Sequence, residues 1–232
     1  LGTRLGFNTT FYSWDNLNRA ARIIHVEMEP TAIGRYFPVE LGIHGDAGRV
    51  AAQLSRELRS HRAGAAAQSW LAKFTAERRK LLEQRDAAGA QLADPIQPQM
   101  LFKVLRGVLP RDVMVTLDAG TLCLQATDML NYYEPPCLFT PLDYGLVGFS
   151  YACGLGAKAA CPGRTVVSLM GDGGFGMTLG ELGTAVEYGL NTVVIVMNNH
   201  CWGAEKAYQR DFFGARYLGA NVRNPPFDKV AE

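Results

Sequence analysis

The sequence has no long apolar run and little net charge. No stretch of about 18 consecutive apolar residues occurs, and the first residues lack a charged segment followed by an apolar one, so neither a membrane-spanning helix nor a secretory signal is expected. The formal net charge of the 232 residues is +1, which argues against nucleic acid or an acidic lipid surface as the main partner. We therefore expect a cytoplasmic protein with no membrane contact.

Cysteine and histidine are scarce and irregularly spaced. The five cysteines form no CxxC pair, and the four histidines are scattered, so the thiols are expected to be reduced and mostly buried, with no disulfide framework or zinc site. The sequence also lacks a P-loop lysine pattern and a GxGxxG turn after a first strand, which disfavours an unrelated nucleotide-binding module. Apolar residues make up 48% of the chain, enough for a sizeable core.

Three regions of the sequence differ in composition and in hydrophobic pattern. Residues 1–62 contain the strand pattern of RIIHVEM and the amphipathic helix pattern of AGRVAAQLSREL, which are typical of the end of an α/β domain. Residues 63–96 are rich in Ala, Arg, Glu and Gln and predict a helical linker. Residues 97–232 alternate between helix patterns and buried strands such as VMVTL, TVVSLM and NTVVIVM. This alternation predicts a parallel sheet with helices on both faces.

Glycine, acid and amide residues follow the three buried strands. They are DAG at 118–120, GDGG at 171–174 and NNHC at 198–201. In parallel sheets, ligands bind beyond the carboxyl ends of the strands, so these segments are expected to converge on one rim.

The residues at this rim suit a cation and a phosphate. Glycines around Asp172 let backbone N–H groups approach an anion, and a carboxylate beside a phosphate requires a cation between them. Mg²⁺ takes oxygen ligands and shares them with phosphates. Asn199 offers an amide oxygen and Cys201 a backbone carbonyl. The alternative is that GDGG is only a strand-to-helix turn and the two asparagines only a strand end.

These motifs together resemble a known signature. GDG followed by NN, with Asp172 and Asn199 standing 27 positions apart (199 − 172), and YGLVGFSYACGLGAKAA upstream, resemble the thiamine diphosphate motif of the acetolactate synthase-like 2-oxo acid decarboxylases and carboligases. The resemblance implies that residues 1–62 are the end of the family's central FAD/NAD-like domain, and that residues 97–232 are its diphosphate-binding domain, truncated. It also implies carbon–carbon cleavage, ligation or acyl transfer on a 2-oxo acid or aldehyde.

The same resemblance implies a set of site residues. Asp172 and Asn199 would bind Mg²⁺ through their side chains and Cys201 through its carbonyl. Val147 would lie under the cofactor, where the family places a bulky apolar residue to bend it. The full cofactor-binding set would be Ala119, Gly120, Thr121, Leu122, Gly145, Val147, Gly171, Asp172, Gly173, Gly174, Asn199, Cys201, Trp202, Gly203 and Ala204.

The family activates its cofactor with a glutamate from a separate N-terminal domain on a second subunit. This chain has no such domain, so its catalytic residue is unknown, and we expect the chain to be a fragment, or the described part, of a longer enzyme that forms a homodimer or homotetramer. Some relatives bind FAD in the central domain, and residues 1–62 do not decide that point.

The segment after the asparagines bears on the substrate. WGAEK, with Gln209, Asp211, Phe212 and Arg216 downstream, resembles the sulfoacetaldehyde acetyltransferases of this family. Lys206, Gln209 and Arg210 would suit an anionic head group. Other possibilities remain. The segment could be a solvent-exposed amphipathic helix, the chain could belong to a family member with another substrate, or it could be a non-catalytic cofactor-binding fragment of this fold.

Overall fold

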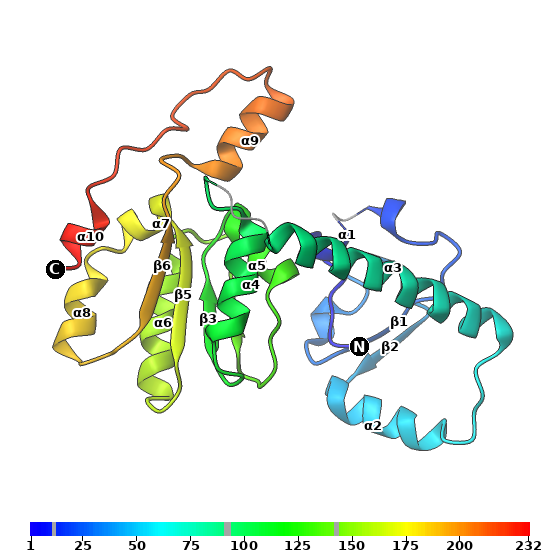
Figure 1. Ribbon diagram of the computed structural model, residues 1–232. Helices are drawn as coiled ribbons and strands as arrows, with labels where there is room; N and C mark the ends of the chain where they lie inside the picture. Colours follow the sequence, from blue (N-terminus) through cyan, green and yellow to red (C-terminus); the bar gives the residue numbers. More distant parts are fainter. Residues whose placement is uncertain (11–12, 91–93, 142–143) are drawn as a thin grey trace. The chain divides into compact units, whose positions relative to one another are not determined.

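The computed structural model describes residues 1–10, 13–90, 94–141 and 144–232 (Figure 1). The chain forms two compact units, residues 1–78 and 79–232. Each unit has its own sheet, and each is described by itself below.

The first unit contains a two-stranded parallel sheet. Strands β1 (Ile24–Glu27) and β2 (Leu41–His44) pair with Ile24 opposite Leu41, and Val26 is fully buried between its neighbours. The predicted strand and amphipathic helix are therefore both present. The other elements of this unit are α1 (Phe7–Thr10), η1 (Trp14–Asn16), η2 (Pro30–Ala32) and α2 (Ala47–Glu57).

A long helix, α3 (Ala65–Gly89), begins in the first unit and ends in the second. It confirms the helix that the composition of residues 63–96 predicts. Near its end, the Arg85 guanidinium donates to the Asp128 backbone carbonyl at 3.1 Å and pairs with the Asp128 carboxylate. These bonds attach the last turns of α3 to the end of α5 (Thr121–Met129).

The second unit contains a four-stranded parallel sheet in the order β4-β3-β5-β6. Leu117 lies opposite Leu169, and Gly171 lies opposite Met197. The parallel sheet is thus confirmed, with all four carboxyl ends at one edge. The strands are β3 (Met114–Leu117), β4 (Leu138–Phe139), β5 (Val166–Gly171) and β6 (Val193–Met197).

Helices cover both faces of this sheet. Alternate side chains of its strands point to opposite sides, and apolar side chains on each side pack against helices. Val115, Leu117, Val167 and Leu169 share one apolar cluster with residues of α4 (Pro98–Val108) and α5. Met170 belongs to a second cluster on the other face. That cluster includes residues of α6 (Phe149–Ala160) and side chains packed from α8 (Glu181–Glu187).

Two short helices follow β5. Asp172 begins α7 (Asp172–Met177). Helix α8 comes next and ends at Glu187, just before the chain turns at Gly189 with a φ of 63°. The last two helices are α9 (Gly203–Phe212) and α10 (Phe227–Val230).

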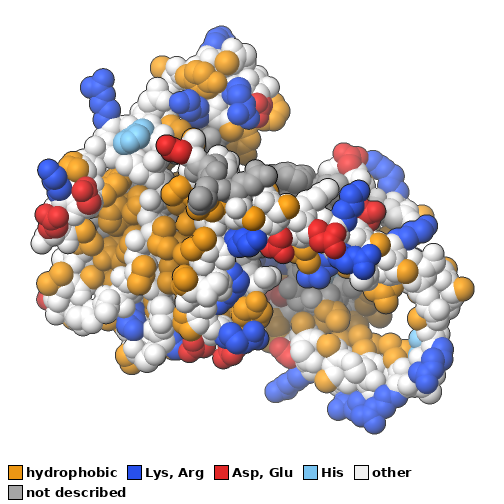
Figure 2. All heavy atoms as spheres, in the orientation of Figure 1, with side chains coloured by type: hydrophobic (Ala, Val, Ile, Leu, Met, Phe, Trp, Pro, Cys, Tyr) orange, Lys and Arg blue, Asp and Glu red, His pale blue; other side chains and the backbone are white. Residues whose placement is uncertain are grey.

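Edge strand β6 leaves apolar surface uncovered in this chain. Val186, Tyr188 and Val193 are exposed around α8 and the start of β6, and Figure 2 shows hydrophobic side chains gathered over this part of the second unit. Within the described ranges, none of the helices has the length and apolar character that crossing a bilayer requires.

Candidate functional site

Three neighbouring strand ends meet at one edge of the second sheet. Asp118 follows β3, Asp172 follows β5 and Asn198 follows β6. Because β5 pairs in parallel with both β3 and β6, these residues emerge on adjacent strands at the same edge. Figure 1 shows α9 beyond these strand ends. The convergence expected from the sequence is therefore present.

Asp172 is a buried carboxylate with a side-chain amide as its partner. Its side chain is only 2% exposed, and its Oδ2 accepts a hydrogen bond from Asn224 Nδ2 at 2.6 Å. Burial of a carboxylate requires such partners or a cation, since an uncompensated buried charge is costly. The position therefore suits a cation ligand.

Gly173 and Gly174, which follow Asp172, have neighbouring side chains too close to leave room for a Cβ. A Cβ on Gly173 would lie 2.4 Å from the Trp202 ring, and a Cβ on Gly174 would lie 1.9 Å from Asp118 Oδ2. Real side chains do not tolerate such distances. The first residues of α7 are thus held between Asp118, which follows β3, and Trp202, which lies beyond β6. We call Gly173 and Gly174 the cradle, because they present no side chains.

The residues after β6 form a tight turn. Asn199 Oδ1 accepts from the Cys201 backbone N–H at 3.2 Å, and His200 has a φ of 56°. Cys201 pairs with Asn221 in an antiparallel bridge. The bonds of this bridge run from Trp202 N to Ala220 O and from Val222 N to His200 O, both at 2.8 Å. The Cys201 carbonyl is therefore not used by the bridge.

Two further expected residues, Thr121 and Gly203, lie close to the turn after β6. A Cβ on Gly203 would lie 3.4 Å from Asn199 Nδ2 and 4.0 Å from Thr121 Oγ1, which places the segment after β3 beside the segment after β6. Gly120, with a φ of 104°, adopts a backbone conformation that favours glycine and starts α5.

The other expected residues have different surroundings. Leu122 packs against the apolar core instead. Val147 is half-buried and directly precedes Gly148, where a Cβ would lie 3.9 Å from Gly174 O. The remaining members are Ala119, Gly145, Gly171 and Ala204.

Asp118 is a buried residue that sequence reasoning did not assign to the site. Its carboxylate accepts from Gly148 N at 3.1 Å and from Ser150 N at 3.2 Å, at the start of α6. Burial raises the pKa of Asp118 above its ordinary value, and the backbone N–H groups offset part of that rise. Its place after a buried strand was visible in the DAG segment. Asn224, by contrast, gave no signal in the sequence.

Three polar side chains of the expected substrate helix have partners within the chain. Lys206 Nζ donates to Asn221 Oδ1 at 2.9 Å, and Gln209 makes two bonds with the backbone of Leu218, at 3.0 and 2.7 Å. Arg210 pairs with Asp211. Residues 201–221 thus form a lobe, and these three polar side chains bond to other residues of the same lobe.

The donor set fits Mg²⁺. The side chains of Asp172 and Asn199 and the carbonyl of Cys201 provide oxygen atoms, which Mg²⁺ prefers. Gly173 and Gly174, directly after Asp172, are buried against Trp202 and Asp118. Within the described part of the chain, no cluster of three or more His, Cys, Asp or Glu side chains suits a metal ion. The candidate set differs from such clusters because it contains a single acid.

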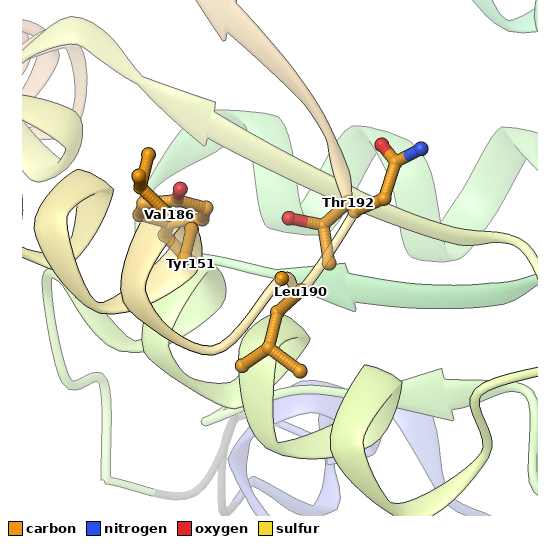
Figure 3. Close-up of a pocket in the computed structure, with 7 residues that line it drawn as sticks. Tyr151, Val186, Leu190 and Thr192 are labelled. Carbon is orange, nitrogen blue, oxygen red and sulfur yellow. The ribbon is translucent and has the colours of Figure 1, made fainter.

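A shallow hollow of about 320 Å³ lies elsewhere in the second unit (Figure 3). Tyr151, Val186, Leu190 and Thr192 are among its lining residues. None of its lining residues belongs to the candidate site, and none is charged. It therefore adds nothing to the chemistry of the rim.

Comparisons with known proteins agree with the fold. Residues 118–232 match the family model described as thiamine pyrophosphate enzyme, C-terminal TPP binding domain. The chain is similar to a sulfoacetaldehyde acetyltransferase of Alcaligenes xylosoxydans xylosoxydans, with 31% identity over all of this chain and 42% of the relative. It is also similar to acetolactate synthase large subunits. That of Parasynechococcus marenigrum is 30% identical over 94% of this chain and 34% of the relative. That of Mycobacterium tuberculosis is 34% identical over 98% and 40%. The chain thus spans between about a third and two fifths of the length of these relatives.

Proposed function

The chain belongs to the thiamine pyrophosphate enzyme family, whose C-terminal TPP-binding domain residues 118–232 match, and we propose that it is part of an enzyme that binds thiamine diphosphate through Mg²⁺ and acts on 2-oxo acids or related carbonyl compounds. The reaction would be carbon–carbon cleavage, ligation or acyl transfer. One observation carries the proposal: the buried Asp172 directly follows β5, beside the strand that Asn199 follows, and two buried glycines come after it.

The chain's own residues would bind and orient the cofactor. The side chains of Asp172 and Asn199 and the Cys201 carbonyl would hold Mg²⁺, while Gly173 and Gly174 and the start of α5 would face the diphosphate. Val147, one residue before Gly148, would support the cofactor rings. When bound, the cofactor would supply an electron sink for the electron pair left on a substrate's carbonyl carbon after a bond from that carbon is broken. The protein contributes position and electrostatics.

The proposal predicts that Asp172→Ala in the full-length protein abolishes Mg²⁺-dependent binding of thiamine diphosphate, because the cation loses its only charged protein ligand. Calorimetric titration of thiamine diphosphate at fixed Mg²⁺ measures this directly. Asp228→Ala is a suitable control, since Asp228 is an exposed acid on α10. Unchanged affinity in the Asp172 variant would remove the metal assignment. Binding without turnover of any carbonyl substrate would favour a non-catalytic role.

A second, narrower candidate is sulfoacetaldehyde acetyltransferase activity. The relative from Alcaligenes xylosoxydans xylosoxydans, which carries that name, matches the whole chain, and the lobe of residues 201–221 contains the cationic Lys206 close to the rim. Lys206 would have to bind an anionic head group while it keeps Asn221, and an ammonium group has three donors with which to do so. Assays of the full-length protein with sulfoacetaldehyde plus phosphate, and with pyruvate alone, separate the two activities. Turnover of pyruvate alone would exclude the narrower one as the main activity.

A further inference from the structure

Asn224 links two strand ends of the candidate site. Its Nδ2 donates to Asp172 Oδ2 at 2.6 Å and to Asn198 Oδ1 at 3.2 Å. Asp172 follows β5 and Asn198 follows β6, so one amide group joins the segments that carry the two proposed side-chain ligands of the cation. Asn224 itself lies 25 positions after Asn199 (224 − 199) and outside every motif of the sequence.

The fold holds the backbone of Asn224 on both sides. Before it, the Val222 N–H donates to the His200 carbonyl at 2.8 Å, which ties the returning chain to the turn after β6. After it, two prolines follow, and a residue before proline is restricted to extended conformations. Phe227 then packs edge-on against Phe175 of α7, with ring centroids 5.1 Å apart. The position of the amide is therefore set by the lobe on one side and by α7 on the other.

A neutral amide donor is well suited to orient a carboxylate that binds a cation. It occupies one oxygen of Asp172 and leaves the other for the cation, and it adds no charge that would repel the cation. Because Asp172 is only 2% exposed, water does not easily replace this donor. Hydrogen bonds to the ligands of a metal fix their orientation, and their loss typically weakens metal binding by about 10–100-fold.

We propose that Asn224 is a positioning residue that holds the Asp172 carboxylate, together with the strand end that carries Asn199, in the arrangement that binds the divalent cation. Asn224 has this role only if Asp172 binds the cation in the function proposed above. The opposite arrangement is that the Asn224 amide occupies the place of the cation and must leave when the cation binds. The two arrangements predict opposite effects of removing the Asn224 amide. Cation binding becomes weaker in the first and stronger in the second.

The test is calorimetric titration of Mn²⁺ into the full-length protein, freed of metal and supplied with thiamine diphosphate, for wild type, Asn224→Ala and Asn221→Ala. Asn221 is a matched control, because it lies three positions earlier (224 − 221) and its Oδ1 accepts from Lys206 instead. We expect Asn224→Ala to bind Mn²⁺ about 10–100-fold more weakly and Asn221→Ala to bind it as the wild type does. We also expect the metal-free variants to unfold at nearly the wild-type temperature, which a purely structural role would not allow.

A second variant keeps the test decisive if Asn224→Ala does not fold. Asn224→Gln retains the amide donor on a longer side chain and should recover part of the affinity. Equal Mn²⁺ affinity in wild type and Asn224→Ala, tighter binding in the variant, or equal losses in the Ala and Gln variants would each overturn the role of Asn224 and leave the proposed function intact. Absence of Mn²⁺ binding in the wild type would instead overturn the proposed function, and the role of Asn224 with it.

Discussion

At the scale of single residues, two buried carboxylates at neighbouring strand ends have different surroundings. Asp118 accepts from backbone N–H groups at the start of α6, which orient its carboxylate. Asp172 accepts from the side chain of Asn224, which belongs to a distant segment of the chain. Asp118 therefore joins α6 to the sheet, whereas Asp172 is the acid that suits a cation.

The surroundings of Asp118 predict how it affects stability at different pH values. Burial raises the pKa of Asp118 above its ordinary value of 3.8, so the folded protein binds this proton more tightly than the unfolded chain. Its contribution to the free energy of unfolding is complete below pH 3.8 and is lost as the pH rises through the raised pKa. The slope for one such group is at most about 1.4 kcal/mol per pH unit.

Urea unfolding of wild type and Asp118→Asn, from below pH 3.8 to neutral pH, measures this contribution, because the other titrating groups cancel in the difference. We expect the stability of wild type relative to the variant to fall with rising pH and then level off. A relative stability that rises with pH would mean that the backbone N–H groups outweigh burial and lower the pKa of Asp118.

At the scale of elements, helix α6 packs on the sheet through small and polar residues. Thr116, Ser150 and Ser168 are fully buried. Thr116 Oγ1 contacts Ser168 Oγ at 2.8 Å and donates to the Ser150 carbonyl at 2.8 Å. These bonds satisfy polar groups that would otherwise be costly to bury. The close approach of helix and sheet depends on Gly154 and places Gly148, at the start of α6, beside the cradle.

Two glycines of α6 therefore predict opposite effects of the same substitution. A Cβ on Gly154 would lie 2.2 Å from Ser168 Oγ, whereas a Cβ on Gly156 meets nothing within 4 Å. We expect Gly154→Ala to destabilise the protein by about 1–3 kcal/mol through overpacking. Gly156→Ala should stabilise it by up to about 1 kcal/mol through helix propensity. Urea unfolding of both variants checks this, and equal effects of one sign would show that Gly154 is not a packing contact.

At the scale of the whole molecule, the two units differ in how much they bury. Among the residues that the structure describes, the buried apolar ones of the first unit are Val26, Ala32 and Phe37, whereas most of the core lies on β3, β5 and the helices that cover them. A two-stranded sheet is only marginally stable by itself in water. The sheet of the second unit is therefore the more stable platform, and the candidate site lies at its edge.

This difference predicts the pattern of amide hydrogen exchange in the chain. Strands with many buried contacts exchange slowly, because their amides open only through large-scale unfolding. We expect the slowest exchange in β3 and β5, and much faster exchange in β1 and β2. Mass spectrometry of peptides from exchanged protein resolves these strands. Protection of β1 and β2 equal to that of β3 and β5 would contradict the smaller core of the first unit.

The sequence alone determined the main strands and which segments lie at the carboxyl ends of the strands. Buried strands follow from apolar runs whatever surrounds them, and parallel pairing follows from the helices between them. Both predictions are confirmed by β3, β5 and β6. The family was indicated by a resemblance, which rests on Asp172, Asn199 and the glycines between them. The roles of the individual site residues stay predictions that the titrations above would test.

Only the tertiary structure decided which distant residues serve the rim. Asp118 accepts from residues 30 and 32 positions away, and Asn224 donates to a residue 52 positions away, so no local pattern can reveal either contact. The lobe likewise gives Lys206 and Gln209 partners at Asn221 and Leu218, which no pattern in the sequence revealed. Such contacts arise where the chain returns to the same strand ends, and the path of that return is set by packing against the sheet.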